Sequence, residues 1–85
     1  MNKFILTVQG CLLHPENYTK DQLKENYRAA DAVYRAKVSA ADAAEYAAAR
    51  AAYYTARVEY CLNEYFQLTG ENRQDYIDAI NKGNK

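Results

Sequence analysis

The residues best suited to chemistry or recognition in this sequence are tyrosines and arginines that recur at helical spacing. Tyr46, Arg50, Tyr53, Arg57 and Tyr60 step by four and three positions, so on a continuous helix they would share one face. Tyrosine and arginine are enriched at binding hot spots because each combines a large contact area with a polar end. The same two side chains can stack on the bases of single-stranded nucleic acid and contact its phosphates. The series therefore predicts a surface that binds a macromolecule.

The other reactive side chains do not form a catalytic or metal-binding pattern. Cys11 and Cys61 lie far apart in the sequence with no CxxC motif, and His14 has no paired ligand or nucleophile nearby. No phosphate-binding loop, dinucleotide fingerprint or nucleophile elbow is present. We therefore predict no catalytic residue, no metal ligand, no cofactor and no small-molecule substrate, and we expect a protein that is not an enzyme.

The amino-acid composition bears on where the protein is located and on which kinds of partner it can bind. The chain has 85 residues, and its 11 basic and 11 acidic side chains leave no net charge to attract nucleic acid or an anionic membrane. No run approaches the roughly 18 apolar residues of a membrane span. The apolar run from Phe4 to Val8 is shorter than the apolar core of a signal peptide, which has roughly 7 to 15 residues. We expect a cytoplasmic protein with reduced thiols and no membrane partner.

The first part of the chain is the only part that favours β structure. Several residues between 4 and 14 are β-branched or bulky, and Gln9-Gly10 has the composition of a turn. We predict a short strand or a small hairpin here, within a strand and loop region over residues 1–18. The expected fold is mainly α, in a single small domain covering residues 1–85.

The helices are better marked. Thr19 to Gln22 has the form of a capping box, no glycine or proline follows until Gly70, and alanine dominates the interval. These signals predict a long helical segment over 19–69 and a short helix over 72–82, which Asn72 caps and Gly83 closes. A second capping box at Ser39 favours a helical hairpin with a break near residue 39. An eleven-residue alanine repeat supports the alternative, one long helix.

An apolar stripe along this segment needs a covering surface. It contains Ala40, Ala44, Ala47, Ala51, Tyr54, Val58, Cys61, Tyr65 and Leu68. A matching stripe with Leu23, Tyr27 and Tyr34 precedes it, and a long rod could be covered only by a second copy. Bulky apolar side chains are few even in a hairpin, so we expect a homodimer.

Three stretches carry a resemblance to a known group of proteins: AADAVYRA, AAYYTARVEYC and EYFQLTGENRQDYIDAI. In style they resemble the small alanine- and tyrosine-rich helical accessory proteins of tailed bacteriophages, over about residues 28 to 80. The resemblance implies an inhibitor, antitoxin or counter-defence factor that binds a host protein such as a toxin or nuclease in the host cytoplasm, sometimes together with RNA. It transfers no functional residue to this chain.

The sequence thus predicts a small non-enzymatic protein that modulates a macromolecular partner by occupying its surface. A protein partner is the leading expectation, with Tyr46, Arg50, Tyr53, Arg57 and Tyr60 as contacts. One alternative is an RNA-binding module that uses the same face. Another is a structural homo-oligomeric subunit whose tyrosines pack internally.

Overall fold

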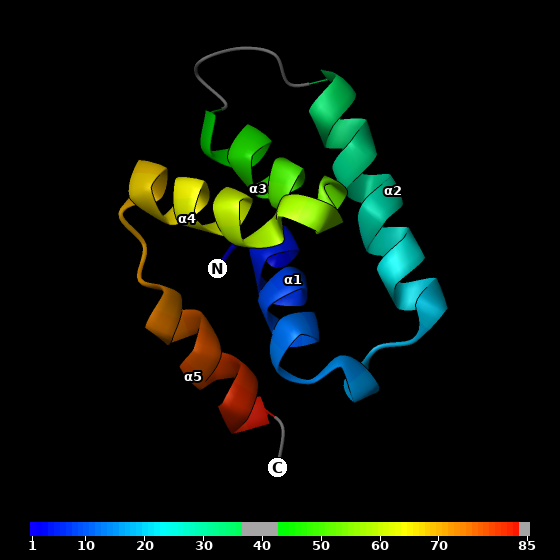
Figure 1. Cartoon of the computed structure of the whole chain (residues 1–85), viewed down its shortest axis with the longest axis vertical. Coiled ribbons are helices and arrows are strands. Elements are labelled where there is room, and N and C mark those ends of the chain that lie inside the picture. The colour runs from blue at the N-terminus through cyan, green and yellow to red at the C-terminus, as the bar shows by residue number, and fades with distance from the viewer. Residues whose placement is uncertain (37–42, 84–85) are drawn as a thin grey trace.

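The computed structural model describes residues 1–36 and 43–83, which form five α-helices and two short 3-10 turns (Figure 1). The helices are α1 (Lys3–Leu13), α2 (Lys20–Ala36), α3 (Ala43–Tyr53), α4 (Val58–Thr69) and α5 (Arg73–Gly83), and the turns are η1 (Pro15–Asn17) and η3 (Thr55–Arg57). In Figure 1, α1 lies between α2 and α5, while α3 and α4 cross above it. The prediction of a mainly α fold is confirmed.

The predicted strand or hairpin over residues 4–14 is wrong, because these residues form α1 and the described part of the chain contains no strand. Asn2 starts the helix, since its Oδ1 accepts hydrogen bonds from the backbone nitrogens of Phe4 (2.9 Å) and Ile5 (3.3 Å). Ile5 and Gln9, four positions apart, are both buried, as the helical repeat requires. Strand preference largely reflects packing on a half-buried surface, so burial in a helix overrides it here.

Gly10 lies in the interior of α1, although its neighbourhood has the composition of a turn. The reason is a close approach, because a β-carbon at this position would lie 2.0 Å from the hydroxyl oxygen of Tyr18. The Tyr18 ring therefore packs on the bare backbone of α1, and this contact holds the chain after η1 against the helix.

Replacing Gly10 by alanine should have opposite effects in two backgrounds. In the wild type it should lower the melting temperature, because the new methyl group displaces the Tyr18 ring and overpacking typically costs about 1–3 kcal/mol. In a Tyr18→Ala background the same change should raise the melting temperature, because alanine favours a helix over glycine by about 0.5–1 kcal/mol. Thermal unfolding of the four proteins tests this, and the same sign in both backgrounds would contradict the contact with Tyr18.

The predicted helix boundaries at α2, α4 and α5 have the expected capping contacts. The Thr19 nitrogen donates to Oε1 of Gln22 (2.8 Å), and the Gln22 nitrogen donates to Oγ1 of Thr19 (3.1 Å), which completes the capping box. Gly70 ends α4 with a left-handed φ of 73°, and its nitrogen donates to the carbonyl of Phe66 (2.9 Å). Oδ1 of Asn72 accepts from the Gln74 nitrogen (2.8 Å) at the start of α5.

The stretch 19–69 is neither one helix nor a simple hairpin, because it contains α2, α3 and α4. Ser39, where the first break was expected, lies outside the described residues. A second break follows Tyr53, where Tyr54 has a non-helical φ and ψ of −94° and 75°. Aromatic residues lose side-chain freedom in a helix, and two of them, Tyr53 and Tyr54, occur in succession here.

This second break lets α4 fold back on α3 and enclose the core with α1 and α5. The buried side chains of this core are Ile5, Ala47, Ala48, Ala51, Cys61, Leu62, Tyr65 and Tyr76. The alanines of α3 let the neighbouring helices approach closely. Much of the apolar stripe of residues 44–68 is therefore covered within one chain. This part of the stripe therefore needs no second copy to cover it.

Candidate functional site

Four tyrosine rings from α2 and α3 interleave in a stack that we call the tyrosine ladder. Its order is Tyr27, Tyr53, Tyr34 and Tyr46. The ring centroids of successive members lie 5.1, 5.3 and 5.1 Å apart, and the successive planes are inclined by 16°, 8° and 20°. Successive rings of the ladder come alternately from α2 and α3. Along the stack the residue number rises on α2, from Tyr27 to Tyr34, and falls on α3, from Tyr53 to Tyr46. The two helices therefore run in opposite directions beside it.

The spacing of the tyrosines in the sequence explains the ladder. Tyr27 and Tyr34 are seven positions apart, as are Tyr46 and Tyr53. Seven residues of α-helix rise by roughly 10.5 Å. This rise is about twice the separation of the stacked rings, so one ring from the facing helix fits between each pair. Aromatic pairs of this kind add roughly 0.5–1.5 kcal/mol each beyond their buried area.

Tyr54 and Arg50 extend the ladder towards α4. The Tyr54 ring packs edge-on against Tyr53 and Tyr34, and its hydroxyl lies 3.1 Å from the hydroxyl of Tyr34. The Arg50 guanidinium lies 6.0 Å from the centroid of the Tyr54 ring, and its Nη1 donates to Oε1 of Glu64 on α4 at 2.7 Å. The positive charge of Arg50 is thus already paired inside the molecule.

Arg57 and Tyr60 form a separate pair at the start of α4. The Arg57 guanidinium lies 4.9 Å from the centroid of the Tyr60 ring, which is within cation–π distance. Both side chains are exposed. This pair presents a cation and an aromatic ring together at the surface.

The five predicted contact residues are therefore divided between two groups. Tyr46, Arg50 and Tyr53 lie on α3, with the two rings in the ladder and the arginine bound to Glu64. Arg57 and Tyr60 lie beyond the break and form the exposed pair. The single helical stripe assumed a continuous helix, and the break after Tyr53 separates its two halves.

Sequence reasoning did not assign Tyr27, Tyr34 and Tyr54 to the candidate site, although all three belong to the same aromatic cluster. It placed them in apolar stripes, and their rings do lie against the facing helix or its end. The seven-residue spacing of Tyr27 and Tyr34, which matches that of Tyr46 and Tyr53, could have found the first two. Tyr54 lies outside this spacing.

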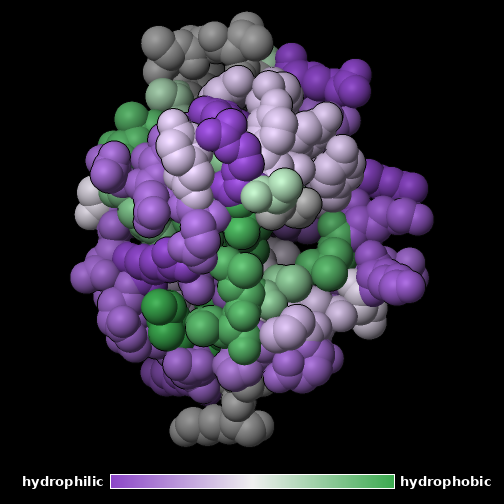
Figure 2. Space-filling view, in the orientation of Figure 1, coloured by the Kyte–Doolittle hydropathy of each residue, from purple (hydrophilic) through white to green (hydrophobic). Residues whose placement is uncertain are grey.

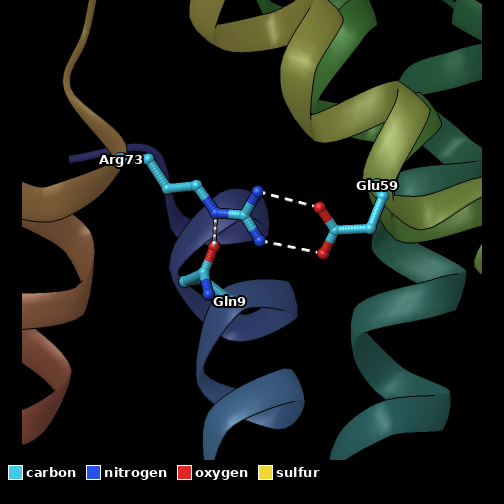
Figure 3. Close-up of polar contacts among 3 residues, drawn as sticks. All are labelled: Gln9, Glu59 and Arg73. Carbon is cyan, nitrogen blue, oxygen red and sulfur yellow. Dashed lines mark hydrogen bonds and ion pairs between the residues drawn. The ribbon is translucent and has the colours of Figure 1, made fainter.

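Arg73 links three helices through one side chain (Figure 3). Its Nη1 and Nη2 donate to the two carboxylate oxygens of Glu59, both at 2.9 Å, and its Nε donates to Oε1 of Gln9 at 2.8 Å. Gln9 is only 2% exposed, so without Arg73 its carbonyl oxygen would lack this charged donor. The contact joins α1, the first turn of α4 and the start of α5.

Acid should weaken the Arg73 contact in a defined direction. The hydrogen bond from Arg73 holds the pKa of Glu59 below its ordinary value of 4.5. A carboxylate with a lowered folded-state pKa contributes stability above its unfolded pKa and loses it as the pH falls through the folded pKa. We expect Glu59→Gln to lower the urea midpoint at pH 7, with the gap to wild type closing as the pH falls well below 4.5.

The matched control is Glu25→Gln, which changes an exposed carboxylate on α2 and should shift the midpoint little at either pH. If the gap for Glu59→Gln stayed constant into acid, the charge of Glu59 would contribute nothing to stability.

A second polar network joins α5 to α4 and to the start of α1. The hydroxyls of Tyr65 and Tyr76 each donate to one carboxylate oxygen of Glu71, and the Asn2 nitrogen donates to the Tyr76 hydroxyl at 2.9 Å. Burial is the main cause that raises the pKa of both tyrosines, so they stay neutral donors. This network positions α5 against α4 and the start of α1.

An apolar groove of about 210 Å³ lies between α1 and the N-terminal half of α2. It is lined by Thr7, Val8, Cys11, Leu12, Leu23, Asn26, Ala51, Ala52 and Val58. Figure 2 shows apolar side chains gathered along the middle of this face, where α1 lies in Figure 1, with hydrophilic side chains on both sides. A cavity of roughly 150 Å³ can hold benzene, so the groove has room for one aromatic or aliphatic side chain.

The remaining candidate residues are Cys11, Cys61 and His14. Cys61 is buried, which raises the pKa of its thiol, and Cys11 is a half-buried free thiol beside the groove. Nε2 of His14 lies 3.1 Å from Oδ1 of Asn81, and its Nδ1 lies 3.6 Å from Oε1 of Glu16. Within residues 1–36 and 43–83, no group of three or more His, Cys, Asp or Glu could hold a metal ion.

None of the helices in the described part of the chain is long and apolar enough to cross a membrane. Comparison of the chain with protein-family models, curated proteins and solved structures found no match. A function must therefore be inferred from the arrangement of the side chains. The most distinctive part of this arrangement is the aromatic cluster of α2 and α3.

Proposed function

We propose that this chain is a non-enzymatic binding protein that inhibits or modulates a protein partner by occupying its surface. The proposed contact surface consists of the outer edges of Tyr27 and Tyr54 together with the Arg57–Tyr60 pair. The observation that carries the proposal is that these tyrosines remain 42%, 37% and 55% exposed for Tyr27, Tyr54 and Tyr60, although each packs on an aromatic or cationic neighbour.

Fixed tyrosine rings suit a binding surface for an energetic reason. Immobilising a flexible side chain on binding costs roughly 0.5–1.5 kcal/mol. Stacking on Tyr53 already restricts Tyr27, and edge-on packing restricts Tyr54, so part of this cost is met before the partner arrives. Tyrosine also offers a large apolar area and a hydroxyl that can bond to the partner.

The contacts favour a protein partner over single-stranded RNA. Base stacking needs a free ring face, whereas the inner ladder rings, Tyr53 and Tyr34, have neighbours on both faces. Glu64 neutralises Arg50, which reduces the charge that phosphates would meet. Arg57 and Tyr60 remain as a cation and an exposed ring, a combination common at protein interfaces.

The resemblance to bacteriophage accessory proteins suggests the kind of partner. On that basis we propose a bacterial host or defence protein, such as a toxin or nuclease. A homodimer stays a prediction, and light scattering of the purified chain tests it separately from binding.

The test is capture of partners from bacterial lysate on immobilised protein, with and without ribonuclease, followed by mass spectrometry and binding measurements with the purified partner. The decisive comparison is between wild type and Arg57→Ala/Tyr60→Ala, which changes two exposed side chains outside the core. The matched control is Leu68→Ala, because Leu68 is a similarly exposed residue further along α4 (52%).

A stoichiometric protein that survives ribonuclease, binds wild type and the control, and loses affinity for the double variant would support the proposal. A partner that disappears with ribonuclease would replace it with RNA binding. Equal affinity of all three proteins for the partner would exclude the Arg57–Tyr60 pair from the contact surface.

A further inference from the structure

We propose that Tyr34 and Tyr54 form a site of oxidative modification, at which a peroxide oxidant joins the two rings as dityrosine and links α2 covalently to the end of α3. Nothing in the proposed binding function requires this chemistry, and it can be tested on the purified chain alone.

The contact between the two hydroxyls selects this pair. In a tyrosyl radical the unpaired electron resides on the oxygen and on the ortho and para ring carbons. The para carbon carries the side chain, so carbon–carbon coupling occurs at the ortho positions beside the hydroxyl. The hydroxyl oxygens of Tyr34 and Tyr54 lie 3.1 Å apart with the ring planes at 76°, which brings the ortho edges of the two rings together.

The stacked pairs of the ladder have a different geometry. Tyr34 and Tyr53, for example, lie face to face with centroids 5.3 Å apart and planes inclined by only 8°. Unlike Tyr34 and Tyr54, these two rings have no hydrogen bond between their hydroxyls, so the ortho carbons beside the hydroxyls are not held close together. The hydroxyl contact therefore distinguishes the pair of Tyr34 and Tyr54 from the stacked pair of Tyr34 and Tyr53.

Tyr34 is the ring most easily oxidised in this arrangement. It has three aromatic neighbours, with Tyr46 and Tyr53 stacked on it and Tyr54 at its edge. Electron-rich neighbours stabilise a ring that has lost an electron, as they stabilise a cation. The hydrogen bond with Tyr54 also lowers the pKa of Tyr34, which eases the loss of the proton that accompanies oxidation.

The reaction balances with a peroxide as the acceptor. Each tyrosine loses one electron and one proton, and the two radicals pair to form one bond between ortho carbons. The hydrogen on each coupled carbon then moves to oxygen, which restores both aromatic rings and both hydroxyls. The two electrons reduce the oxygen–oxygen bond of the peroxide, and the two protons leave to water or to the reduced peroxide.

The link should make the fold more resistant to heat. It closes the chain between residues 34 and 54, and such a closure removes conformations from the unfolded state in the same way as a disulfide. The modified protein should therefore melt at a higher temperature than the unmodified protein.

The experiment oxidises dilute purified protein with persulfate and a light-activated ruthenium sensitiser, followed by tryptic digestion. Trypsin cuts after Arg28, Arg35, Arg50 and Arg57, so Tyr34 lies in the peptide 29–35 and Tyr54 in the peptide 51–57. The expected product is these two peptides joined with the loss of two hydrogen atoms. It should show dityrosine fluorescence, and the oxidised protein should keep the size of a single chain.

Three variants identify the coupled ring. Tyr34→Phe and Tyr54→Phe should reduce the joined peptide to the level obtained from protein oxidised in concentrated urea. Tyr53→Phe is the matched control, because Tyr53 shares the tryptic peptide of Tyr54 and also contacts Tyr34, yet this variant should keep the product. Circular dichroism checks that each variant is folded.

Loss of the product in Tyr53→Phe but not in Tyr54→Phe would overturn the proposal, because coupling would then run through the stacked pair. Joined peptides that arise mainly between two chains, or equally well in urea, would also overturn it, because the fold would not then select the pair.

Discussion

Replacing Leu62 by alanine should lower the free energy of unfolding by about 2–5 kcal/mol, the range for removing a large aliphatic side chain from a core. Leu62 is fully buried on α4, in the cluster that also contains Ile5 of α1 and Tyr76 of α5. At roughly 0.05–0.15 kcal/mol per residue, a chain of this length has about 4–13 kcal/mol of stability in total. The variant should therefore lose a large share of it, as urea unfolding followed by circular dichroism would measure.

Leu68→Ala is the control for this change, because it removes the same atoms from the same helix at a position that is 52% exposed. Substitutions at such surface positions usually change stability by no more than about 0.5 kcal/mol. Similar losses for the two variants would mean that α4 does not place Leu62 inward and Leu68 outward as described.

Replacing Tyr34 by alanine should have the second largest effect, about 1.5–4.5 kcal/mol, because it removes three aromatic contacts at roughly 0.5–1.5 kcal/mol each. Tyr34 contacts Tyr46, Tyr53 and Tyr54, so its removal opens the middle of the ladder and loosens α2 from α3. Urea unfolding gives the size of the loss. Limited proteolysis should show earlier cleavage in α2 than in the wild type.

Two further variants separate stacking from other effects of this change. Tyr34→Phe keeps the ring and loses only the hydroxyl contact with Tyr54, so it should cost no more than about 1 kcal/mol. Tyr60→Ala removes an exposed ring outside the ladder and should cost less than Tyr34→Ala. If Tyr34→Phe cost as much as Tyr34→Ala, the hydroxyl and not the stack would hold the helices together.

The parts of the fold that could be predicted are those set by local backbone chemistry. The capping box at Thr19, the left-handed glycine at position 70 and the cap at Asn72 each involve residues within a few positions of one another. Such contacts form wherever the sequence allows them, because exposed helix ends need hydrogen-bond partners. The starts of α2 and α5 and the end of α4 were therefore predictable.

The N-terminal segment could not be predicted in the same way, because its structure depends on residues far along the chain. Ile5 is buried among side chains of α3, α4 and α5, and Gly10 is explained by the ring of Tyr18. Judged by intrinsic propensity alone, the β-branched residues and the glycine of this segment favour a strand and a turn. The packing of this segment against the other helices outweighs both preferences, and the segment forms α1.

The candidate site was predictable in its residue types but not in its geometry. The helical spacing identified Tyr46 and Tyr53 correctly as members of one face of α3. The break at Tyr54 has no glycine or proline to mark it, so the division of that face could not be foreseen. The ladder also needs α2 and α3 to be antiparallel, and only a structure supplies their relative direction.

The central position of α1 has a consequence for the synthesis of the protein. Ile5 is translated before Leu62, Tyr65 and Tyr76, which help to bury it. At roughly 5–20 residues per second, α1 must wait about 4–14 seconds for its last partner. Until α4 and α5 are made, the apolar side chains of α1 lack part of their cover, so we expect chaperones that recognise apolar segments to bind the nascent chain before the core closes.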